Sequence, residues 1–166
     1  MKPGDTAPTF ELPSDDGTTI RLSDELAQGP VVLFFYPKAM TPGCTKESCH
    51  FRDLQAEFDA AGATRLGISA DKPTLQAKFA SKYDLDFPLL SDADGSIARA
   101  FGASRRGPLF NRRITYVIAA DGRLLDIIKS ELNMEVHGDR ALEILKANTD
   151  RRVKLEADEP DPARRN

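Results

Sequence analysis

An uninterrupted apolar segment, VVLFFY at residues 31–36, constrains the fold of this chain most strongly. A strand with one face in water alternates polar and apolar residues, whereas a run of aliphatic and aromatic side chains is typical of a strand buried on both faces. Pro37 ends the run, because proline has no N–H group for a sheet ladder. Such a strand needs helices packed over it, so the segment predicts an α/β domain.

The segments that follow alternate between helix and strand patterns. Apolar residues recur every three or four positions across residues 43–61, and Gly62 follows as a C-cap, which predicts an amphipathic helix. Residues 63–70 then form a strand pattern, and residues 75–83 form a second helix pattern after Pro73. Strands separated by helices pair in parallel, so we expect a parallel part of the sheet here.

Two Asp-Gly turns predict hairpins on either side of this unit. One joins residues 10–12 to 18–22, and the other joins the two strands of the segment 113–129. Between them we expect a short strand within residues 87–95 and a short helix at 96–102; a last helix is predicted at roughly 137–146. The expected fold class is α/β with a thioredoxin-like fold, in which helices flank a central mixed sheet and an N-terminal β-hairpin precedes it.

The chain has 166 residues, enough for one domain with a real core. We assign residues 1–147 to that domain. Residues 148–166 are rich in both charge signs and offer almost nothing to bury, so we expect a flexible C-terminal tail.

Charge and hydropathy exclude several functional classes. The formal net charge is −3 and the sequence pI is about 5.4, so the chain has no general attraction to nucleic acid or to an anionic membrane. Neither a membrane-spanning run nor the apolar core of a signal peptide is present, and we expect a cytoplasmic protein. In a reducing compartment, two nearby cysteines favour catalysis, redox sensing or metal binding over a permanent disulfide.

Cys44 lies where the loop after the buried strand becomes a helix. The free N–H groups and the dipole at a helix N-terminus favour an anion, and therefore the thiolate form of a cysteine. Pro42-Gly43 forms a turn directly before it. Because such turns lie at the surface, we expect the Cys44 side chain to be accessible.

Cys49 lies five positions further along the same predicted helix. Five helical residues separate two Cα atoms by roughly 8.6 Å, whereas a disulfide tolerates at most about 6.8 Å. The two cysteines can therefore form a disulfide only if the first turns of the helix unwind.

The segment PKAMTPGCTKESCHFRD resembles the active-site segment of the peroxiredoxins. Pro37, Thr41 and Cys44 meet the family pattern Pro-x3-Thr-x2-Cys. The Cys-x4-Cys spacing is similar to the subgroup called peroxiredoxin Q or bacterioferritin comigratory protein. The resemblance extends over roughly residues 3–146, including FFYPK, LLSDADG and the strand RITYVI.

The resemblance implies a thiol-dependent peroxidase without cofactor, metal or haem. Cys44 would attack hydrogen peroxide or an organic hydroperoxide and become a sulfenic acid, and Cys49 would resolve it as an intramolecular disulfide. Thr41 would hydrogen-bond the thiolate and the peroxide, Pro37 would shield the site from water, and Glu47 would help to hold an arginine. Thioredoxin or a similar dithiol would recycle the disulfide, and we expect a monomer because both cysteines lie in one helix.

The arginine can also be located from the predicted topology. A strand antiparallel to residues 31–36 begins at the sheet edge where that strand ends, so Arg113 should lie beside Cys44. A permanently charged guanidinium with several donors suits stabilisation of a thiolate and polarisation of an O–O bond. Neighbouring Arg112 should point to the opposite face of the strand.

Three other functions are weighed against this one. A protein disulfide oxidoreductase shares the fold, but it favours Cys-x2-Cys, which is absent. A metal or haem site built on Cys44, Cys49 and His50 lacks a second ligand pair and the Cys-x2-Cys-His spacing. A structural protein with vestigial cysteines would not need Pro37, Thr41, Cys44 and Arg113 together. We assign no role to His50 or His137.

Overall fold

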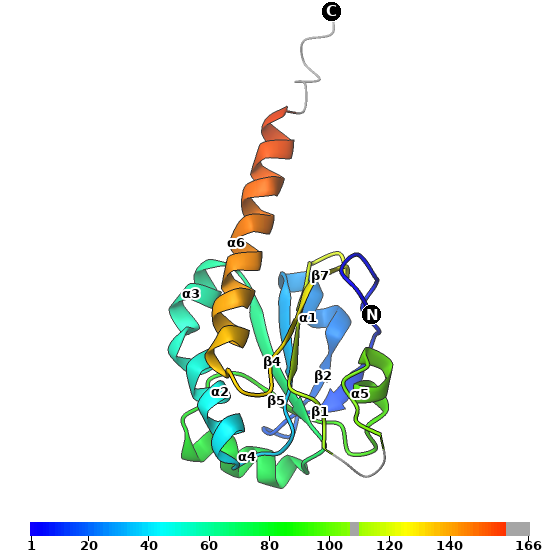
Figure 1. Cartoon of the computed structure of the whole chain (residues 1–166), viewed down its shortest axis with the longest axis vertical. Coiled ribbons are helices and arrows are strands. Elements are labelled where there is room, and N and C mark those ends of the chain that lie inside the picture. Colours follow the sequence, from blue (N-terminus) through cyan, green and yellow to red (C-terminus); the bar gives the residue numbers. More distant parts are fainter. Residues whose placement is uncertain (107–109, 159–166) are drawn as a thin grey trace, which may run out of the picture.

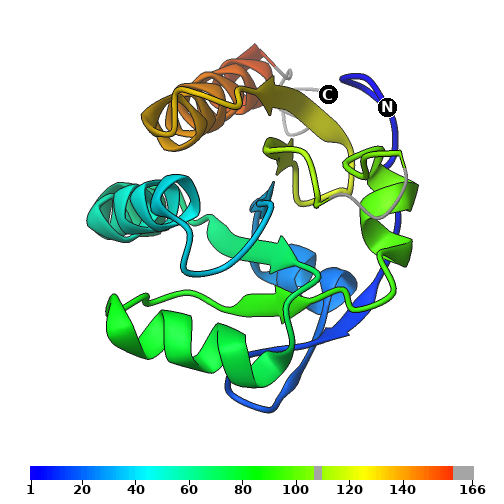
Figure 2. The same ribbon diagram turned by 60° about the horizontal axis from the view of Figure 1, so that its bottom comes forward.

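The computed structural model describes residues 1–106 and 110–158. Its centre is a five-stranded mixed sheet with the strand order β5-β4-β3-β6-β7 (Figures 1 and 2). The strands are β3 (Val31–Phe35), β4 (Thr64–Ser69), β5 (Leu89–Ser91), β6 (Ile114–Ile118) and β7 (Leu124–Lys129). β3, β4 and β5 are parallel to one another, whereas β6 is antiparallel to both β3 and β7. The predicted thioredoxin-like arrangement is confirmed.

The central strand β3 is buried on both faces, as its apolar run predicts. Val31, Leu33 and Phe35 belong to one hydrophobic cluster, and Val32 and Phe34 belong to the other. The alternation of side chains along a strand divides the run between two cores. β3 is therefore held by both cores, and it positions the loop and the helix α2 that follow its C-terminal end.

Helices cover both faces of the sheet (Figure 2). They are α1 (Leu22–Gln28), α2 (Pro42–Asp53), α3 (Gln55–Ala60), α4 (Pro73–Lys82), α5 (Ser96–Phe101) and α6 (Glu135–Asp158). The core beside α1 and α5 also contains residues of the N-terminal hairpin, β1 (Glu11–Pro13) and β2 (Thr19–Arg21). The other core lies beneath α2, α3, α4 and α6. The hairpin was predicted, whereas α1 was not.

The helix predicted over residues 43–61 is interrupted at Leu54, where φ is −92° and ψ is 17°. Buried Arg65 donates a hydrogen bond of 2.5 Å to the Phe51 carbonyl, the acceptor that a continuous helix would offer to the Gln55 N–H. The same guanidinium pairs with Asp86 at 2.5 Å. Arg65 thus binds the Phe51 carbonyl close to the point where α2 ends and α3 begins.

α6 is longer than the sequence predicts. The pattern suggested an end near residue 146, but the helix continues to Asp158 and projects away from the sheet (Figure 1). Strong helix formers make up most of residues 151–157, and no glycine or proline interrupts the extension before Pro160. Residues 148–158 are therefore helical, in contrast to the expected tail, and 159–166 lie outside the described residues. The domain boundary at 147 stays a prediction.

Within the described residues, the structure contains no helix with the length and apolar character needed to cross a bilayer.

Candidate active site

Cys44 is the third residue of α2, directly after Pro42 and Gly43. Pro42 suits the first turn, where a missing N–H leaves no hydrogen bond unmade. Contrary to the expected accessibility, the Cys44 side chain is fully buried. It belongs to the hydrophobic cluster that also contains Ala39 and the half-buried Met40 of the loop before α2. The turn residue Pro42 is exposed, whereas the cysteine that follows it belongs to the core.

Arg113 lies beside Cys44 because of the sheet register. Phe35 at the end of β3 is paired with Ile114 at the start of β6, which places Arg113 next to the loop that leads into α2. Its Nη2 atom donates to Cys44 Sγ over 3.4 Å. The guanidinium is almost entirely buried, so little water screens its attraction for the sulfur.

Gly43 permits this close approach. A Cβ atom at position 43 would lie 3.1 Å from Nη2 of Arg113 and 3.1 Å from Cε of Met134. Both distances are tighter than ordinary van der Waals contact. A larger residue would therefore push the guanidinium or the methionine away from the start of α2.

Glu47 follows Cys44 by three residues on the same face of α2 and accepts a hydrogen bond from Nη1 of Arg113. The carboxyl is fully buried, and desolvation raises its pKa to about 8 despite the opposing attraction of Arg113. Its Oε2 atom binds the guanidinium, whereas Oε1 has no hydrogen-bond partner among the described residues. The predicted contact between Glu47 and the arginine is therefore present.

His137, to which we assign no role from the sequence, belongs to the same buried cluster. Its Nε2 atom lies 2.9 Å from the Ser130 carbonyl and its Nδ1 atom 2.8 Å from Oγ1 of Thr115. A carbonyl only accepts, so Nε2 carries a hydrogen, and in the neutral ring Nδ1 accepts from Thr115. Nδ1 also lies 3.7 Å from Oε1 of Glu47.

Burial lowers the pKa of His137 and favours this neutral form. The sequence offered one signal for such a partner: Thr115 is a polar residue within the otherwise apolar strand β6. A buried hydroxyl needs a hydrogen-bond partner, but the sequence does not say which residue supplies it.

Thr41 is the N-cap residue of α2, and its Oγ1 donates to the Lys38 carbonyl over 2.7 Å. No hydrogen bond joins Thr41 to Cys44 among the described residues, and the role that the resemblance implies for Thr41 stays a prediction. Pro37 is half-buried at the end of β3. Asp71 holds the intervening loop, because its Oδ2 accepts the Ala39 N–H at 2.7 Å.

Cys49 is half-buried, and both cysteines are free thiols. α2 is continuous from Pro42 to Asp53, so the two Cα atoms keep the helical separation of roughly 8.6 Å. A disulfide between them requires the helix to open. His50 lies 2.8 Å from Asp139 of α6, and the described part of the chain holds no cluster of three or more His, Cys, Asp or Glu suited to a metal.

Comparison with known proteins shows which family this chain resembles. The model of the AhpC/TSA family matches residues 3–127. A putative peroxiredoxin of Mycobacterium tuberculosis is 55% identical over 150 residues, which cover 89% of this chain and 97% of the relative. Peroxiredoxin Bcp of Escherichia coli is 41% identical over 152 residues, which cover 88% of this chain and 96% of the relative.

Solved structures show the same likeness. The crystal structure of peroxidoxin BcpB from Mycobacterium tuberculosis aligns with a TM-score of 0.86 at 54% identity and covers 89% of this chain and 97% of its own. Peroxiredoxin Q of Xanthomonas campestris aligns with a TM-score of 0.77 at 34% identity, covering 83% and 90%. The matches span the buried strand, the cysteine helix and the arginine strand, and the chain therefore belongs to the AhpC/TSA family as a peroxiredoxin, a thiol-dependent peroxidase.

Proposed function

We propose that Cys44 is the nucleophile of this peroxidase. The observation that carries the proposal is the hydrogen bond from Nη2 of Arg113 to Cys44 Sγ at the first turn of α2. A buried guanidinium and the free N–H groups of a helix N-terminus both stabilise a thiolate. No other cysteine of the chain has this combination, since Cys49 lies in the second half of α2.

In the first step, the thiolate attacks one oxygen of the peroxide and the O–O bond breaks. Cys44 becomes a sulfenic acid, and the other oxygen leaves as hydroxide or alkoxide and takes up a proton to give water or an alcohol. The sulfur loses two electrons and the peroxide gains them. Arg113 lies where it can stabilise the charge that develops on the departing oxygen.

The surrounding residues position these groups. Glu47 holds the Arg113 guanidinium at an angle that leaves Nη2 for the sulfur. Pro37 shields the reacting atoms from water. Thr41 hydrogen-bonds the peroxide once its hydroxyl rotates away from the Lys38 carbonyl, a rotation about a single bond.

In the second step, the Cys49 thiolate attacks the Cys44 sulfur, an S–S bond forms as the S–O bond breaks, and hydroxide leaves and takes up a proton to give water. Because α2 must unwind for the sulfurs to meet, each catalytic cycle includes opening and re-formation of the helix start. A thioredoxin-type dithiol then reduces the disulfide and restores both thiols. Since one chain supplies both cysteines, we propose a monomer as the working unit.

Two matched variants test these assignments. Cys44→Ser should abolish peroxide consumption in a steady-state assay with thioredoxin, thioredoxin reductase and NADPH. Cys49→Ser should consume one equivalent of peroxide and stop, with Cys44 captured as a sulfenic acid by a dimedone probe. Full activity of Cys44→Ser would refute the nucleophile assignment, and full turnover of Cys49→Ser would refute the resolving role.

A further inference from the structure

Four ionisable side chains meet in the interior at the start of α2. They are Cys44, Glu47, Arg113 and His137; Arg113 is 5% exposed, and the other three are fully buried. Of these four, only Arg113 carries a permanent positive charge, whereas Cys44 and Glu47 each become negative when they lose a proton. One buried cation balances one buried anion, and a second anion without a partner is costly. The cluster therefore favours a single anion, either the thiolate or the carboxylate.

The two oxygens of Glu47 have different surroundings. Oε2 accepts a hydrogen bond from Nη1 of Arg113. Oε1 has no hydrogen-bond partner among the described residues, and Nδ1 of His137 lies 3.7 Å from it. A buried carboxylate needs donors for both oxygens, because it has lost its contact with water. A neutral carboxyl carries a hydrogen on one oxygen, and Oε1, which has no donor, is the oxygen suited to carry it.

His137 presents a lone pair to this oxygen. Nε2 donates its hydrogen to the Ser130 carbonyl over 2.9 Å, so the neutral ring has no hydrogen on Nδ1, which accepts from Thr115 over 2.8 Å. The 3.7 Å between Nδ1 and Oε1 of Glu47 is too long for a hydrogen bond, so the two atoms interact through their partial charges. A lone pair repels a carboxylate oxygen and attracts the hydrogen of a neutral carboxyl. His137 thus disfavours ionisation of Glu47.

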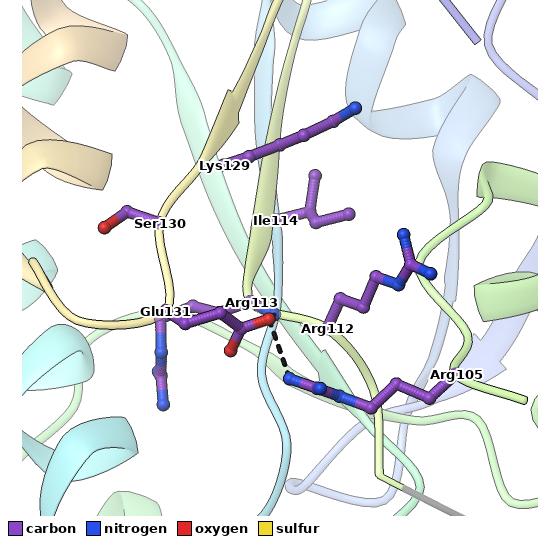
Figure 3. Close-up of a pocket in the computed structure, with 7 residues that line it drawn as sticks. All are labelled: Arg105, Arg112, Arg113, Ile114, Lys129, Ser130 and Glu131. Carbon is purple, nitrogen blue, oxygen red and sulfur yellow. Dashed lines mark hydrogen bonds and ion pairs between the residues drawn. The ribbon is translucent and has the colours of Figure 1, made fainter.

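The other charged groups near Glu47 are Arg113 and Glu131. Burial raises the pKa of Glu47 to about 8; Arg113 opposes this rise, and the negative charge of Glu131 adds to it. Glu131 follows β7 and turns its carboxylate to Arg105 beside a cavity of about 360 Å³ at the ends of β6 and β7 (Figure 3). Arg112 points to that cavity, away from the side that the Arg113 side chain takes (Figure 3). Arg105 therefore balances Glu131 and leaves the Arg113 charge to the buried cluster.

The proton shared by the carboxyl and the imidazole belongs to Glu47 rather than to His137. Burial lowers the pKa of His137; the hydrogen bond to Ser130 and the charge of Glu131 oppose this change, and the charge of Arg113 adds to it. A protonated carboxyl is neutral and adds no second charge to the interior. The cluster then holds one cation and, once the thiol has ionised, one thiolate anion.

We propose that His137 is a positioning residue that holds Glu47 in its protonated form, so that the Arg113 charge acts on the thiolate alone. The hydrogen of the carboxyl lies on Oε1 and faces Nδ1, while Oε2 accepts from Nη1 of the guanidinium. Because Nη2 donates to the sulfur, the guanidinium is shared with a neutral group instead of a competing anion. The proposal rests on the proposed role of Cys44 and adds a protonation state and the residue that controls it.

The first test determines both protonation states in the reduced, unmodified protein at about pH 7. The ultraviolet absorbance of a thiolate reports on Cys44 and is assigned by its loss in Cys44→Ser. The infrared C=O stretching band of a neutral carboxylic acid reports on Glu47 and is assigned by its loss in Glu47→Gln. Both signals should be present in the same sample. Glu131→Gln is the matched control, since it removes an exposed carboxyl beside Arg113 and should leave the carboxylic acid band in place.

The second test follows the reaction with hydrogen peroxide as a function of pH. Ionisation of Glu47 creates an anion that competes with the sulfur for Arg113, so the second-order rate constant for oxidation of Cys44 should fall as the pH rises through about 8. A fall of about tenfold corresponds to the charge interaction of one pKa unit. In Glu47→Gln the amide cannot ionise, and stopped-flow measurements of that variant should not show the fall.

The third test changes His137 itself. His137→Gln offers an amide N–H that can donate to Oε1 of Glu47, which favours the carboxylate. The carboxylic acid band should disappear at about pH 7, and the thiolate absorbance and the rate constant with hydrogen peroxide should fall, the latter by about tenfold. The double variant His137→Gln/Glu47→Gln should recover both, because no carboxylate is left to compete. Loss of rate in His137→Gln without loss of the band, or without this recovery, would show a merely structural role.

Two further results would overturn the proposal. Absence of either signal in the unmodified protein at about pH 7 would contradict the paired thiolate and neutral carboxyl, and this measurement needs no change at position 137. Identical pH profiles for the unmodified protein and Glu47→Gln would show that this carboxyl does not compete for Arg113. If hydrogen peroxide failed to oxidise Cys44 in the unmodified protein, the proposed nucleophile would be wrong, whereas the carboxylic acid band does not depend on peroxide.

Discussion

Two ion pairs meet at Arg113 and differ mainly in their surroundings. Glu47 and Arg113 pair with side chains that are 0% and 6% exposed, whereas Arg105 and Glu131 pair with side chains that are 39% and 47% exposed. The Arg113 backbone N–H also donates to Glu131, so one residue connects both pairs. A buried pair fixes a geometry because either partner alone is a costly buried charge, while an exposed pair is screened by water and contributes little. This difference suits the buried pair to hold the Arg113 guanidinium beside Cys44.

The largest expected effect comes from breaking the buried pair. Above about pH 8, where the Glu47 carboxyl is ionised, Glu47→Ala leaves the buried Arg113 charge without its partner and should lower the free energy of unfolding by about 3–5 kcal/mol in urea titrations. Glu131→Ala, the matched change in the exposed pair, should lower it by less than about 1 kcal/mol. Similar losses in the two variants would contradict the distinction between the pairs.

The buried carboxyl also predicts a pH dependence of stability. Burial raises the pKa of Glu47 to about 8 from its ordinary value of 4.5, so between these values the folded protein binds more protons than the unfolded chain. The free energy of unfolding should therefore fall as the pH rises through this window. Burial lowers the pKa of His137, which gives the opposite slope below about pH 6.5 and leaves the Glu47 effect clearest above it.

Glu47→Gln isolates this contribution because it keeps an acceptor for Arg113 and removes the titration. Urea unfolding at several pH values between about 6.5 and 8 should show stability falling in the unmodified protein and staying nearly flat in the variant, with a difference on the order of 1–3 kcal/mol. Parallel pH profiles for the two proteins would show that Glu47 does not titrate in this range.

A smaller effect is expected from the hydrogen bond between Thr115 and His137. Thr115→Val keeps the shape of the side chain but leaves Nδ1 of His137 without its donor, which should cost about 1–3 kcal/mol of unfolding free energy. Thr74→Val, at an exposed position in α4, is the control and should change little. An unchanged midpoint for Thr115→Val would mean that the buried ring does not depend on this hydroxyl.

The smallest effect is the coupling within the exposed pair. A double-mutant cycle of Arg105→Gln and Glu131→Gln should give an interaction energy of about 0.2–1 kcal/mol, and high salt should reduce it further. A coupling above about 2 kcal/mol that resists salt would place this pair in the same class as the buried one.

The parts of the site that follow from strand order could be predicted from the sequence. The turn at Asp121-Gly122 predicts the β6–β7 hairpin, and the thioredoxin-like strand order sets β6 antiparallel to β3, which places Arg113 beside Cys44. Because successive side chains along an extended segment point to opposite faces, Arg112 is also predicted to point away from the side that Arg113 takes.

The parts that depend on contacts between distant segments could not be predicted. His137 reaches Thr115 and Glu47 from the start of α6, and no local pattern marks a histidine that will be buried. Likewise, Cys44 is buried in a cluster to which α4 and α6 contribute, and its own local sequence does not reveal this. The break at Leu54 depends on Arg65, a residue of another element. The periodicity of a sequence indicates which face of a helix or strand is buried. It does not indicate which side chain of another helix or strand will contact that face.

The most direct test of the account is peptide mapping by mass spectrometry after the reduced protein meets one molar equivalent of hydrogen peroxide. The account predicts that the peptide holding Cys44 and Cys49 loses two hydrogen atoms within seconds and that thioredoxin restores it. If both thiols stay reduced, or if Cys44 persists as a sulfenic acid while Cys49 is intact, the two-cysteine cycle on α2 is wrong.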